Sequence, residues 1–395
     1  MTKPTPEPFE ISIPDAELED LRSRLSKWRR AADFANDDWR YGTNGEYLAT
    51  LVDYWIDEYD WRAHEARINE FDHFRVAIDD IPIHYLHVRG QGPDPIPLVM
   101  THGWPWTFWD FEKVLRPLSD QAAFGGDPAD AFDLIVPSLP GFGFSSPLEQ
   151  SGVGFARTAE LWHELMHNVL GYERYAAQGG DWGSLVTAAI GHLASDHLIG
   201  VHESMGGFLD LDYGAIPADD YAPEERDWAE RVARRTPAVT SHMAAHTTDP
   251  QTLAFALNDS PVGLAAWIVE RRRAWSDCGG DVERRFSKDD LLTTLSIYWH
   301  TRTIGTSMRF YWESMGEARW HPVHDHSPAV PTPSGFAIFL EDNILVPRKT
   351  AERYANVQRW TVMPRGGHFA PAEEPALLID DIRAFFRELR HEGYA

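Results

Sequence analysis

The N-terminal part of the chain has apolar residues at helical spacing. Residues 18–28 and 48–55 each carry apolar side chains three or four positions apart, which places them along one face of a helix. An irregular aromatic segment at residues 39–42 separates the two stripes. We therefore expect residues 1–75 to form a helical extension that packs on a main domain.

Over residues 74–88 the apolar pattern has a period of two. Residues 74–78 and 83–88 flank Asp79 and Asp80, an arrangement that predicts a β-hairpin. Further strands are predicted at 96–100, 132–136, 175–178, 198–203, 335–341 and 360–363, and helices at 156–170, 185–193 and 375–389. Strands that alternate with helices are typical of an α/β domain with a mostly parallel central sheet and helices on both faces.

Residues 206–330 interrupt this alternation. They are rich in Trp and Arg, have mostly helical patterns and come between the sixth and seventh core strands. Such an insertion predicts a lid over an active site, and the proline-rich residues 327–333 would lead the chain back to the core. The predicted organisation is a wrapping extension (1–75), the first part of the core (76–205), a lid (206–330) and the second part of the core (331–395).

Composition narrows the class of protein. The 395 residues, 43% of them apolar, are enough for one large core with an accessory domain. The chain has no run of 18 apolar residues and no apolar N-terminal stretch, so we expect neither a membrane span nor a signal peptide. The single cysteine, Cys278, excludes an intramolecular disulfide and favours a cytoplasmic enzyme. A net charge of −25 argues against nucleic acid and anionic membranes as partners.

The most informative motif is the run Gly179-Gly180-Asp181-Trp182-Gly183. It has the form small-x-nucleophile-x-small, the tight turn between a strand and a helix called a nucleophile elbow. Asp181 stands where such turns more often carry serine. A carboxylate is suited to displace a leaving group from saturated carbon and to leave an alkyl ester on the enzyme. The alternative is an aspartate that only caps the helix, and the flanking glycines favour the nucleophile.

Two further residues would complete a catalytic set with Asp181. His368 follows two glycines after the last predicted strand, where the general base of such an enzyme would lie. The acid that orients this base should follow the predicted strand at 335–341. Glu341 and Asp342 both qualify, and position favours Asp342.

Tryptophans surround the predicted site. The run His102-Gly103-Trp104-Pro105 ends a predicted strand, at the loop that would supply one backbone N–H of an oxyanion hole. The residue after the nucleophile would supply the other, so Trp104 and Trp182 are the candidates. The cluster of Trp104, Trp106 and Trp109 suggests an aromatic-walled pocket, with Trp106 and Trp109 lining the substrate.

Five strings of this sequence resemble the microsomal-type epoxide hydrolases, a family of the α/β-hydrolase superfamily with an N-terminal extension. The strings are HGWP (102–105), LPGFGFS (139–145), GGDWG (179–183), NDSPVGLAAW (258–267) and PRGGHF (364–369). The resemblance covers residues 8–392 and implies the α/β-hydrolase fold with a helical lid. It also implies a soluble, bacterial-type member. Related soluble enzymes occur in secondary metabolism.

Members of this family usually bind the epoxide oxygen with two lid tyrosines. Tyr311 matches one of them, in the run Arg309-Phe310-Tyr311. At the position of the other, eight residues before Pro250, this chain has His242. A histidine can also donate an N–H, so we expect Tyr311 and His242 to share the epoxide oxygen. The alternative is that His242 lies on the lid surface and Tyr311 acts alone or with another lid group.

The resemblance implies hydrolysis of a small-molecule epoxide to a vicinal diol. Asp181 would form an ester with the substrate, and a water activated by His368 would hydrolyse it. The family's acid, usually Glu, aligns with Asp342. No metal or organic cofactor is required.

Two other functions compete with this interpretation. A haloalkane dehalogenase would use the same nucleophile, with Trp182 binding the halide, but Tyr311 favours an epoxide. A non-catalytic binding protein on the same scaffold would have lost its nucleophile, base or acid, and all three positions are filled. The sequence leaves open the natural epoxide, the carbon attacked, the stereochemistry and whether two copies form a homodimer.

Overall fold

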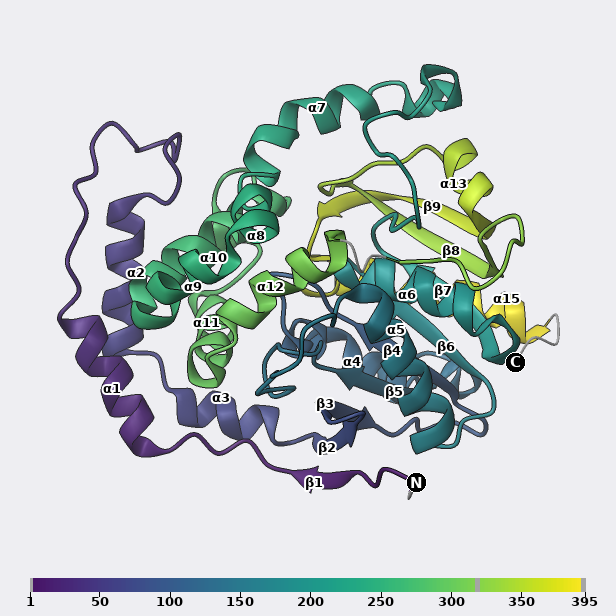
Figure 1. Ribbon diagram of the computed structural model, residues 1–395, viewed down its shortest axis with the longest axis horizontal. Helices are drawn as coiled ribbons and strands as arrows, with labels where there is room; N and C mark the ends of the chain where they lie inside the picture. Colours follow the sequence, from purple (N-terminus) through teal and green to yellow (C-terminus); the bar gives the residue numbers. More distant parts are fainter. Residues whose placement is uncertain (1–2, 317–319, 392–395) are drawn as a thin grey trace.

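The computed structural model describes residues 3–316 and 320–391. These residues contain a nine-stranded sheet with the order β1-β2-β3-β5-β4-β6-β7-β8-β9 (Figure 1). The strands are β1 (Glu7–Phe9), β2 (Asp72–Ile78), β3 (Ile81–Val88), β4 (Ile96–Thr101), β5 (Phe132–Pro137), β6 (Tyr175–Gly179), β7 (Leu198–Glu203), β8 (Val330–Glu341) and β9 (Ala355–Gly367). Pairing is antiparallel from β1 to β5 and parallel from β5 through β4 to β9. The predicted, mostly parallel sheet is confirmed.

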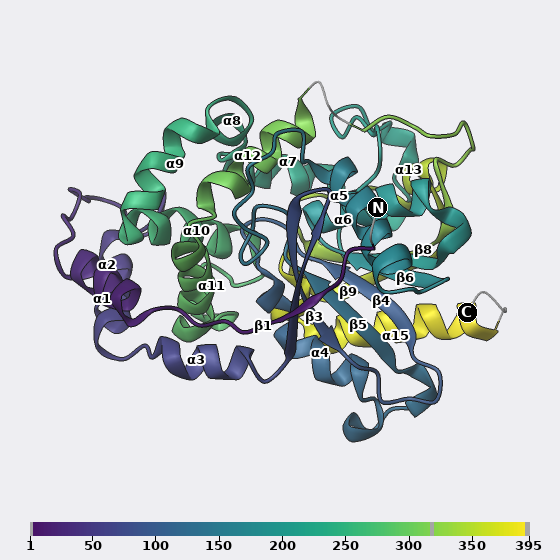
Figure 2. The same cartoon turned by 60° about the horizontal axis from the view of Figure 1, so that its bottom comes forward.

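Helices cover both faces of the sheet (Figure 2). On one face α5 (Phe155–His163) packs on α6 (Trp182–Leu193), and on the other α4 (Glu112–Ser119) packs on α15 (Pro375–His391). The other core helices are α13 (Arg348–Tyr354) and α14 (Ala370–Glu373). The helix predicted over 156–170 is α5 continued by a π-helical turn, η4 (Glu164–Val169). Short 3-10 turns are η1 (Phe108–Phe111), η2 (Ala122–Phe124), η3 (Pro128–Asp130), η5 (Ser195–His197), η6 (Ala218–Asp220), η7 (Pro223–Glu225) and η8 (Val282–Arg284).

The predicted hairpin joins β2 to β3. Asp79 and Asp80 connect the two strands with φ angles of 50° and 63°. A two-residue turn with positive φ at both positions matches the twist of the flanking strands, and Asp tolerates this conformation better than most residues. The local sequence therefore sets the register of the first strands.

The insertion between β7 and β8 is helical. Its helices are α7 (Trp228–Val239), α8 (Met243–Thr248), α9 (Pro250–Asp259), α10 (Pro261–Trp275), α11 (Lys288–Thr301) and α12 (Ile304–Met315). Ser260 begins α10 by accepting a hydrogen bond from the Gly263 N–H, and Pro261 takes the first helical position, where an N–H has no partner in any case. The insertion has no strand within its described residues, 204–316 and 320–329. Figure 1 shows these helices beside the sheet.

The N-terminal extension packs mainly on the insertion. It contains α1 (Asp15–Ser26), α2 (Gly45–Asp57) and α3 (Trp61–Ile68), and both α1 and α2 contact α10. The extension is not wholly helical, because β1 pairs with β2 and adds an edge strand to the sheet. β1 has three residues with a proline at the centre, too few for an alternating pattern to be recognised. The boundary predicted at residue 75 lies inside β2, so the extension and the core share a sheet.

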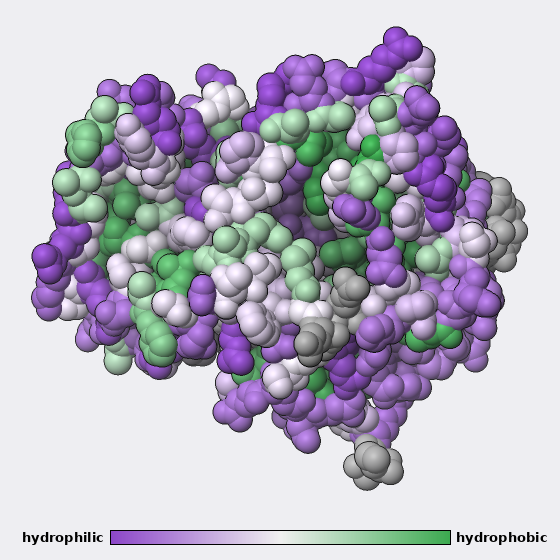
Figure 3. Space-filling model, turned by 45° about the horizontal axis from the view of Figure 1, so that its top comes forward, coloured by the Kyte–Doolittle hydropathy of each residue, from purple (hydrophilic) through white to green (hydrophobic). Residues whose placement is uncertain are grey.

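One face of the surface is mostly hydrophilic, with a hydrophobic hollow. Figure 3 shows a face on which hydrophilic residues predominate and hydrophobic residues gather around a hollow near its centre. Across the described residues, no single helix is long and apolar enough to cross a membrane, and only α9 and α10 taken together, bent by 117°, reach that length and composition.

Candidate active site

The chain turns sharply at Asp181, between β6 and α6. This residue has a φ of 55°, a conformation that non-glycine residues rarely adopt. The neighbouring chain leaves no room for side chains around it: a Cβ on Gly179 would lie 2.2 Å from the Gly183 carbonyl oxygen, and one on Gly183 would lie 1.9 Å from that of Thr101. Within the described residues, the Asp181 side chain makes no capping bond to α6. The glycines therefore permit the turn, and the aspartate is not used as a helix cap.

The Asp181 carboxylate lies between two of its predicted partners. Its Oδ1 accepts a hydrogen bond of 2.8 Å from the Trp104 N–H, and its Oδ2 lies 3.1 Å from His368 Nε2. Trp182 begins α6 directly after Asp181, so its N–H lies at the positive end of that helix. The Asp181 side chain keeps 14% of its surface exposed. A carboxylate held from two sides and still partly exposed is placed to attack a bound small molecule.

His368 is held by one of the two candidate acids. Its Nδ1 lies 2.7 Å from Asp342 Oδ1, and both residues are buried. Glu341, the alternative acid, lies 3.4 Å from Arg231 and 2.5 Å from Arg235, and its side chain is 41% exposed. The structure thus brings Asp342, and not Glu341, to the histidine.

The charges around His368 decide its protonation. Burial alone would lower the pKa of this histidine, but the carboxylates of Asp342 and Asp181 outweigh burial and raise the pKa to about 9. At neutral pH the imidazole is therefore protonated. A reaction that removes the negative charge of Asp181 would lower this pKa and release the proton more easily.

Two lid residues lie against the tryptophans of the site. Tyr311 of α12 meets the Trp182 ring edge-on at 4.7 Å between centroids, and His242, directly before α8, stacks on Trp104 at 5.1 Å. His242 Nε2 and the Tyr311 hydroxyl are 3.2 Å apart, and both residues are buried, so His242 is not a surface residue. Burial lowers the pKa of His242 to about 3 and raises that of Tyr311 well above its usual range. Both side chains are therefore neutral at pH 7.

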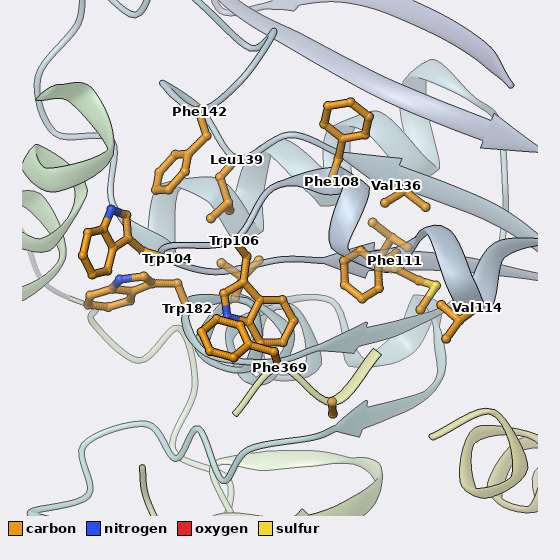
Figure 4. Packing of buried hydrophobic residues seen from close by; sticks show 14 of the residues in the cluster. Trp104, Trp106, Phe108, Phe111, Val114, Val136, Leu139, Phe142, Trp182 and Phe369 are labelled. Atoms are coloured by element: carbon orange, nitrogen blue, oxygen red, sulfur yellow. The ribbon is translucent and has the colours of Figure 1, made fainter. Parts of the chain in front are cut away.

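The structure brings Trp106, but not Trp109, to this site. The Trp106 ring lies edge-on to His368 at 5.6 Å, and Figure 4 shows Trp104, Trp106 and Trp182 close together. Trp109 packs on Phe71 and Phe108 instead, at 5.9 and 6.3 Å. No ring contact within the described chain joins Trp109 to the other site residues, because η1 turns its side chain toward the extension.

Sequence reasoning missed two aromatic residues of the site. Trp275, at the end of α10, has its ring 5.1 Å from that of His368 and 4.9 Å from that of His242. His246 of α8 lies 4.5 Å from the Trp104 ring. His246 follows His242 by four residues, the spacing of neighbours on a helix, and that spacing was a usable signal. No such signal marked Trp275, because its position in the site depends on where α10 ends.

A buried ion pair joins the lid to the loop that carries Trp104. Arg272 of α10 places Nη1 2.5 Å from Asp110 Oδ1, and its Nη2 donates to the Pro105 carbonyl oxygen at 2.9 Å. Both charged side chains are buried. The lid therefore supports the backbone N–H that binds Asp181.

Fold and site together define an α/β hydrolase with an aspartate at the elbow. Two family models match the chain. One, described as "alpha/beta hydrolase fold", matches residues 96–375, and the other, "Epoxide hydrolase N terminus", matches residues 6–111. The second match spans the extension and the first core strands, including the loop with Trp104.

Individual relatives agree with these matches over nearly their whole length. A protein assigned as an epoxide hydrolase in Stigmatella aurantiaca is 39% identical, over 97% of this chain and 85% of its own. Epoxide hydrolase 1 of Oryctolagus cuniculus is 36% identical, over 96% and 88%. The crystal structure of juvenile hormone epoxide hydrolase from the silkworm Bombyx mori superposes with a TM-score of 0.88 at 27% identity, covering 99% of this chain and 96% of that one. The chain belongs to the epoxide hydrolase family of the α/β-hydrolase fold.

Proposed function

We propose that this protein hydrolyses epoxides to vicinal diols in two steps, through an alkyl ester on Asp181. One observation carries the proposal: the partly exposed Asp181 carboxylate is bound by the Trp104 N–H on one oxygen and lies beside the His368 imidazole on the other. In this arrangement the carboxylate can act as a nucleophile, and it lies next to both an oxyanion site and a base.

Ring opening is the first step. A carboxylate oxygen of Asp181 attacks a ring carbon, the bond between that carbon and the epoxide oxygen breaks, and the oxygen takes its electron pair. Tyr311 hydrogen-bonds this oxygen and supplies the proton it needs. His242, 3.2 Å from the Tyr311 hydroxyl, assists as the second lid donor.

Hydrolysis of the ester is the second step. Once Asp181 is an ester, its charge no longer holds the proton on His368, and this proton replaces the one that Tyr311 gave to the epoxide oxygen. Asp342 still orients the ring. Neutral His368 takes a proton from a water, and the resulting hydroxide attacks the ester carbonyl. The N–H groups of Trp104 and Trp182 bind the oxyanion, and the diol leaves as Asp181 is restored.

The parts of the chain take separate roles in this proposal. The core (76–205 and 331–395) supplies nucleophile, base and acid, and the lid (206–330) supplies the two donors. The extension (1–75) supports the lid through the contacts of α1 and α2 with α10. Trp106 lines the substrate beside His368. The single, buried Cys278 supports a cytoplasmic location.

A second candidate function rests on the indole groups. The Nε1–H groups of Trp104 and Trp182 are buried without a hydrogen-bond partner among the described residues. Such donors would suit a departing halide, as in a haloalkane dehalogenase. The neutral, buried Tyr311 phenol favours an epoxide, since an alkoxide needs a proton and a halide does not.

A product assay separates the two functions. The enzyme is incubated with a panel of aryl and alkyl epoxides and, as the control, with 1,2-dibromoethane. We expect diol from at least one epoxide class and no bromide. Rapid bromide release without epoxide opening would overturn the proposal.

A further inference from the structure

The carboxylate of Glu373 binds the backbone on both sides of His368. Its Oε1 accepts from the Phe369 N–H at 2.9 Å, and its Oε2 accepts from the Gly367 N–H at 3.2 Å. Glu373 lies in α14, directly after the loop that carries the histidine. The same Oε2 accepts a third bond of 2.8 Å, from the N–H of Asp277.

The last residue of lid helix α10 and a residue just after that helix bind the remaining amides of this loop. The His368 N–H donates to the Trp275 carbonyl oxygen at 3.0 Å, and the Gly366 N–H donates to Asp277 Oδ2 at 3.0 Å. Four consecutive amides, from Gly366 to Phe369, are thus bound in turn by the lid and by Glu373. The approach is close, since a Cβ on Gly367 would lie 2.7 Å from the Asp277 nitrogen.

Burial and N–H donors act in opposite directions on the Glu373 carboxylate. Its side chain has no exposed surface, and Arg285 Nε lies 4.0 Å from its Oε2. Arg285 is itself paired with Asp277 and with Glu374, at 2.9 and 2.7 Å. Burial raises the pKa of Glu373 to about 7, against the opposing effect of the N–H donors of Asp277 and Phe369 and the charges of Arg285 and His368. The bonds from the Asp277 and Phe369 N–H groups are the main stabilisation of its charge.

We propose that Glu373 is a positioning residue that holds the His368 loop in register with the end of lid helix α10. The inference rests on the proposed function, because it assigns His368 the role of base. A glutamate that only capped α14 would need the Phe369 N–H alone. Glu373 also binds Gly367 and Asp277, so one side chain joins the core loop to the lid.

This placement has a consequence for the two steps. Ring opening depends on Asp181 and the lid donors, whose contacts do not include Glu373. Ester hydrolysis depends on the direction in which His368 presents Nε2. Loosening of the loop should therefore slow hydrolysis and leave ester formation nearly unchanged.

The test compares Glu373→Gln with Glu374→Gln in the full chain. The amide keeps the length of Glu373 but turns one acceptor into a donor that faces backbone N–H groups. Glu374 is the matched control, because its buried carboxylate binds the neighbouring Arg285 and Arg365 but none of the four amides. Rapid mixing with styrene oxide, acid quench and intact-mass analysis give the rate of ester formation and the rate of ester loss.

We expect ester loss in Glu373→Gln to slow by about 10- to 100-fold, the scale of a small misplacement of a catalytic group, with ester formation within about 3-fold of the parent. Glu374→Gln should change both rates by the same small factor. An unchanged ratio of the two rates in Glu373→Gln, or an equal change in Glu374→Gln, would overturn the inference. If Glu373→Gln does not fold, Glu373→Asp, which keeps the charge but cannot span the same donors, must show the same imbalance. Absence of any ester in the parent enzyme would instead overturn the proposed function.

Discussion

His242 Nε2 lies 3.2 Å from the hydroxyl of Tyr311, so the two lid residues expected to share an epoxide oxygen are bonded to each other. A single hydrogen occupies that contact. If the imidazole donates it, the phenol hydrogen remains free for the epoxide, and His242 strengthens the phenol as a donor. The two residues then act in series rather than side by side.

A double-mutant cycle should detect this coupling. Tyr311→Phe is expected to slow ester formation by about 10²–10³-fold, the effect of one lost transition-state hydrogen bond. His242→Phe should cost less, and nothing further in the Tyr311→Phe background, since contacting residues are not additive. His242→Tyr should remain active. Fully additive losses would mean that each residue binds the epoxide independently.

His246 is the natural control for that cycle. It lies in the same ring cluster, 4.8 Å from Tyr311, yet its ring nitrogens have no hydrogen-bond partner among residues 3–316 and 320–391. His246→Phe should therefore change ester formation by the same factor with or without the Tyr311 hydroxyl.

The two candidate acids should separate in kinetics. Asp342→Asn is expected to slow ester hydrolysis by up to about 10⁴-fold, the scale for loss of a carboxylate that orients a catalytic histidine. Glu341→Gln, which removes only the contacts with Arg231 and Arg235, should change hydrolysis little. Single-turnover rates of ester loss measure both. Slower ester hydrolysis in Glu341→Gln than in Asp342→Asn would reverse the assignment.

The raised pKa of His368 can be read directly by NMR. Its imidazole should titrate with a midpoint near the value of about 9, and Asp181→Asn should lower that midpoint, because one of the two carboxylates is then lost. The same pairing affects the stability of the fold. Because the pKa of His368 in the folded protein lies above its unfolded value of about 6.5, pairing with the two carboxylates stabilises the fold fully below about pH 6.5. This contribution is lost as the pH rises through about 9. A midpoint unchanged in Asp181→Asn would show that the nucleophile does not control the base.

Removal of Arg272 should destabilise the fold. Arg272→Met leaves Asp110 buried and unpaired, which typically costs about 3–5 kcal/mol in the free energy of unfolding. The double change Arg272→Met with Asp110→Asn should recover part of the loss, because no buried charge remains. Urea unfolding measures both variants. A loss below about 1 kcal/mol in the single variant would mean that the pair does not support the loop.

The sheet, the hairpin and the elbow could be predicted because each depends on neighbouring residues. Alternating apolar residues indicate β2 and β3, and short apolar runs indicate the central strands. Paired aspartates suit the hairpin, and Gly179 and Gly183 permit the turn at Asp181. β1 could not be predicted, since an edge strand of three residues has no pattern of its own.

The directions of the side chains in the site were harder to predict than the residues that form it. Trp109 shares a short segment with Trp106, yet the two rings face different parts of the molecule. Position along the chain favoured Asp342 over Glu341, but only the path of the chain after β8 decides which carboxylate meets His368. Glu373 looks like an ordinary residue at a helix start, and its bonds to a loop and to the distant Asp277 depend on tertiary structure.

The most direct test of the two-step mechanism is the intact mass of His368→Gln after incubation with styrene oxide. Asp181 and the lid donors remain in this variant, while the base is lost, so the ester should form and persist. The mechanism predicts a mass increase of one styrene oxide, located by peptide mapping on the segment that contains Asp181. Diol formation by the parent enzyme, with no adduct on Asp181 in the variant at any time, would contradict it.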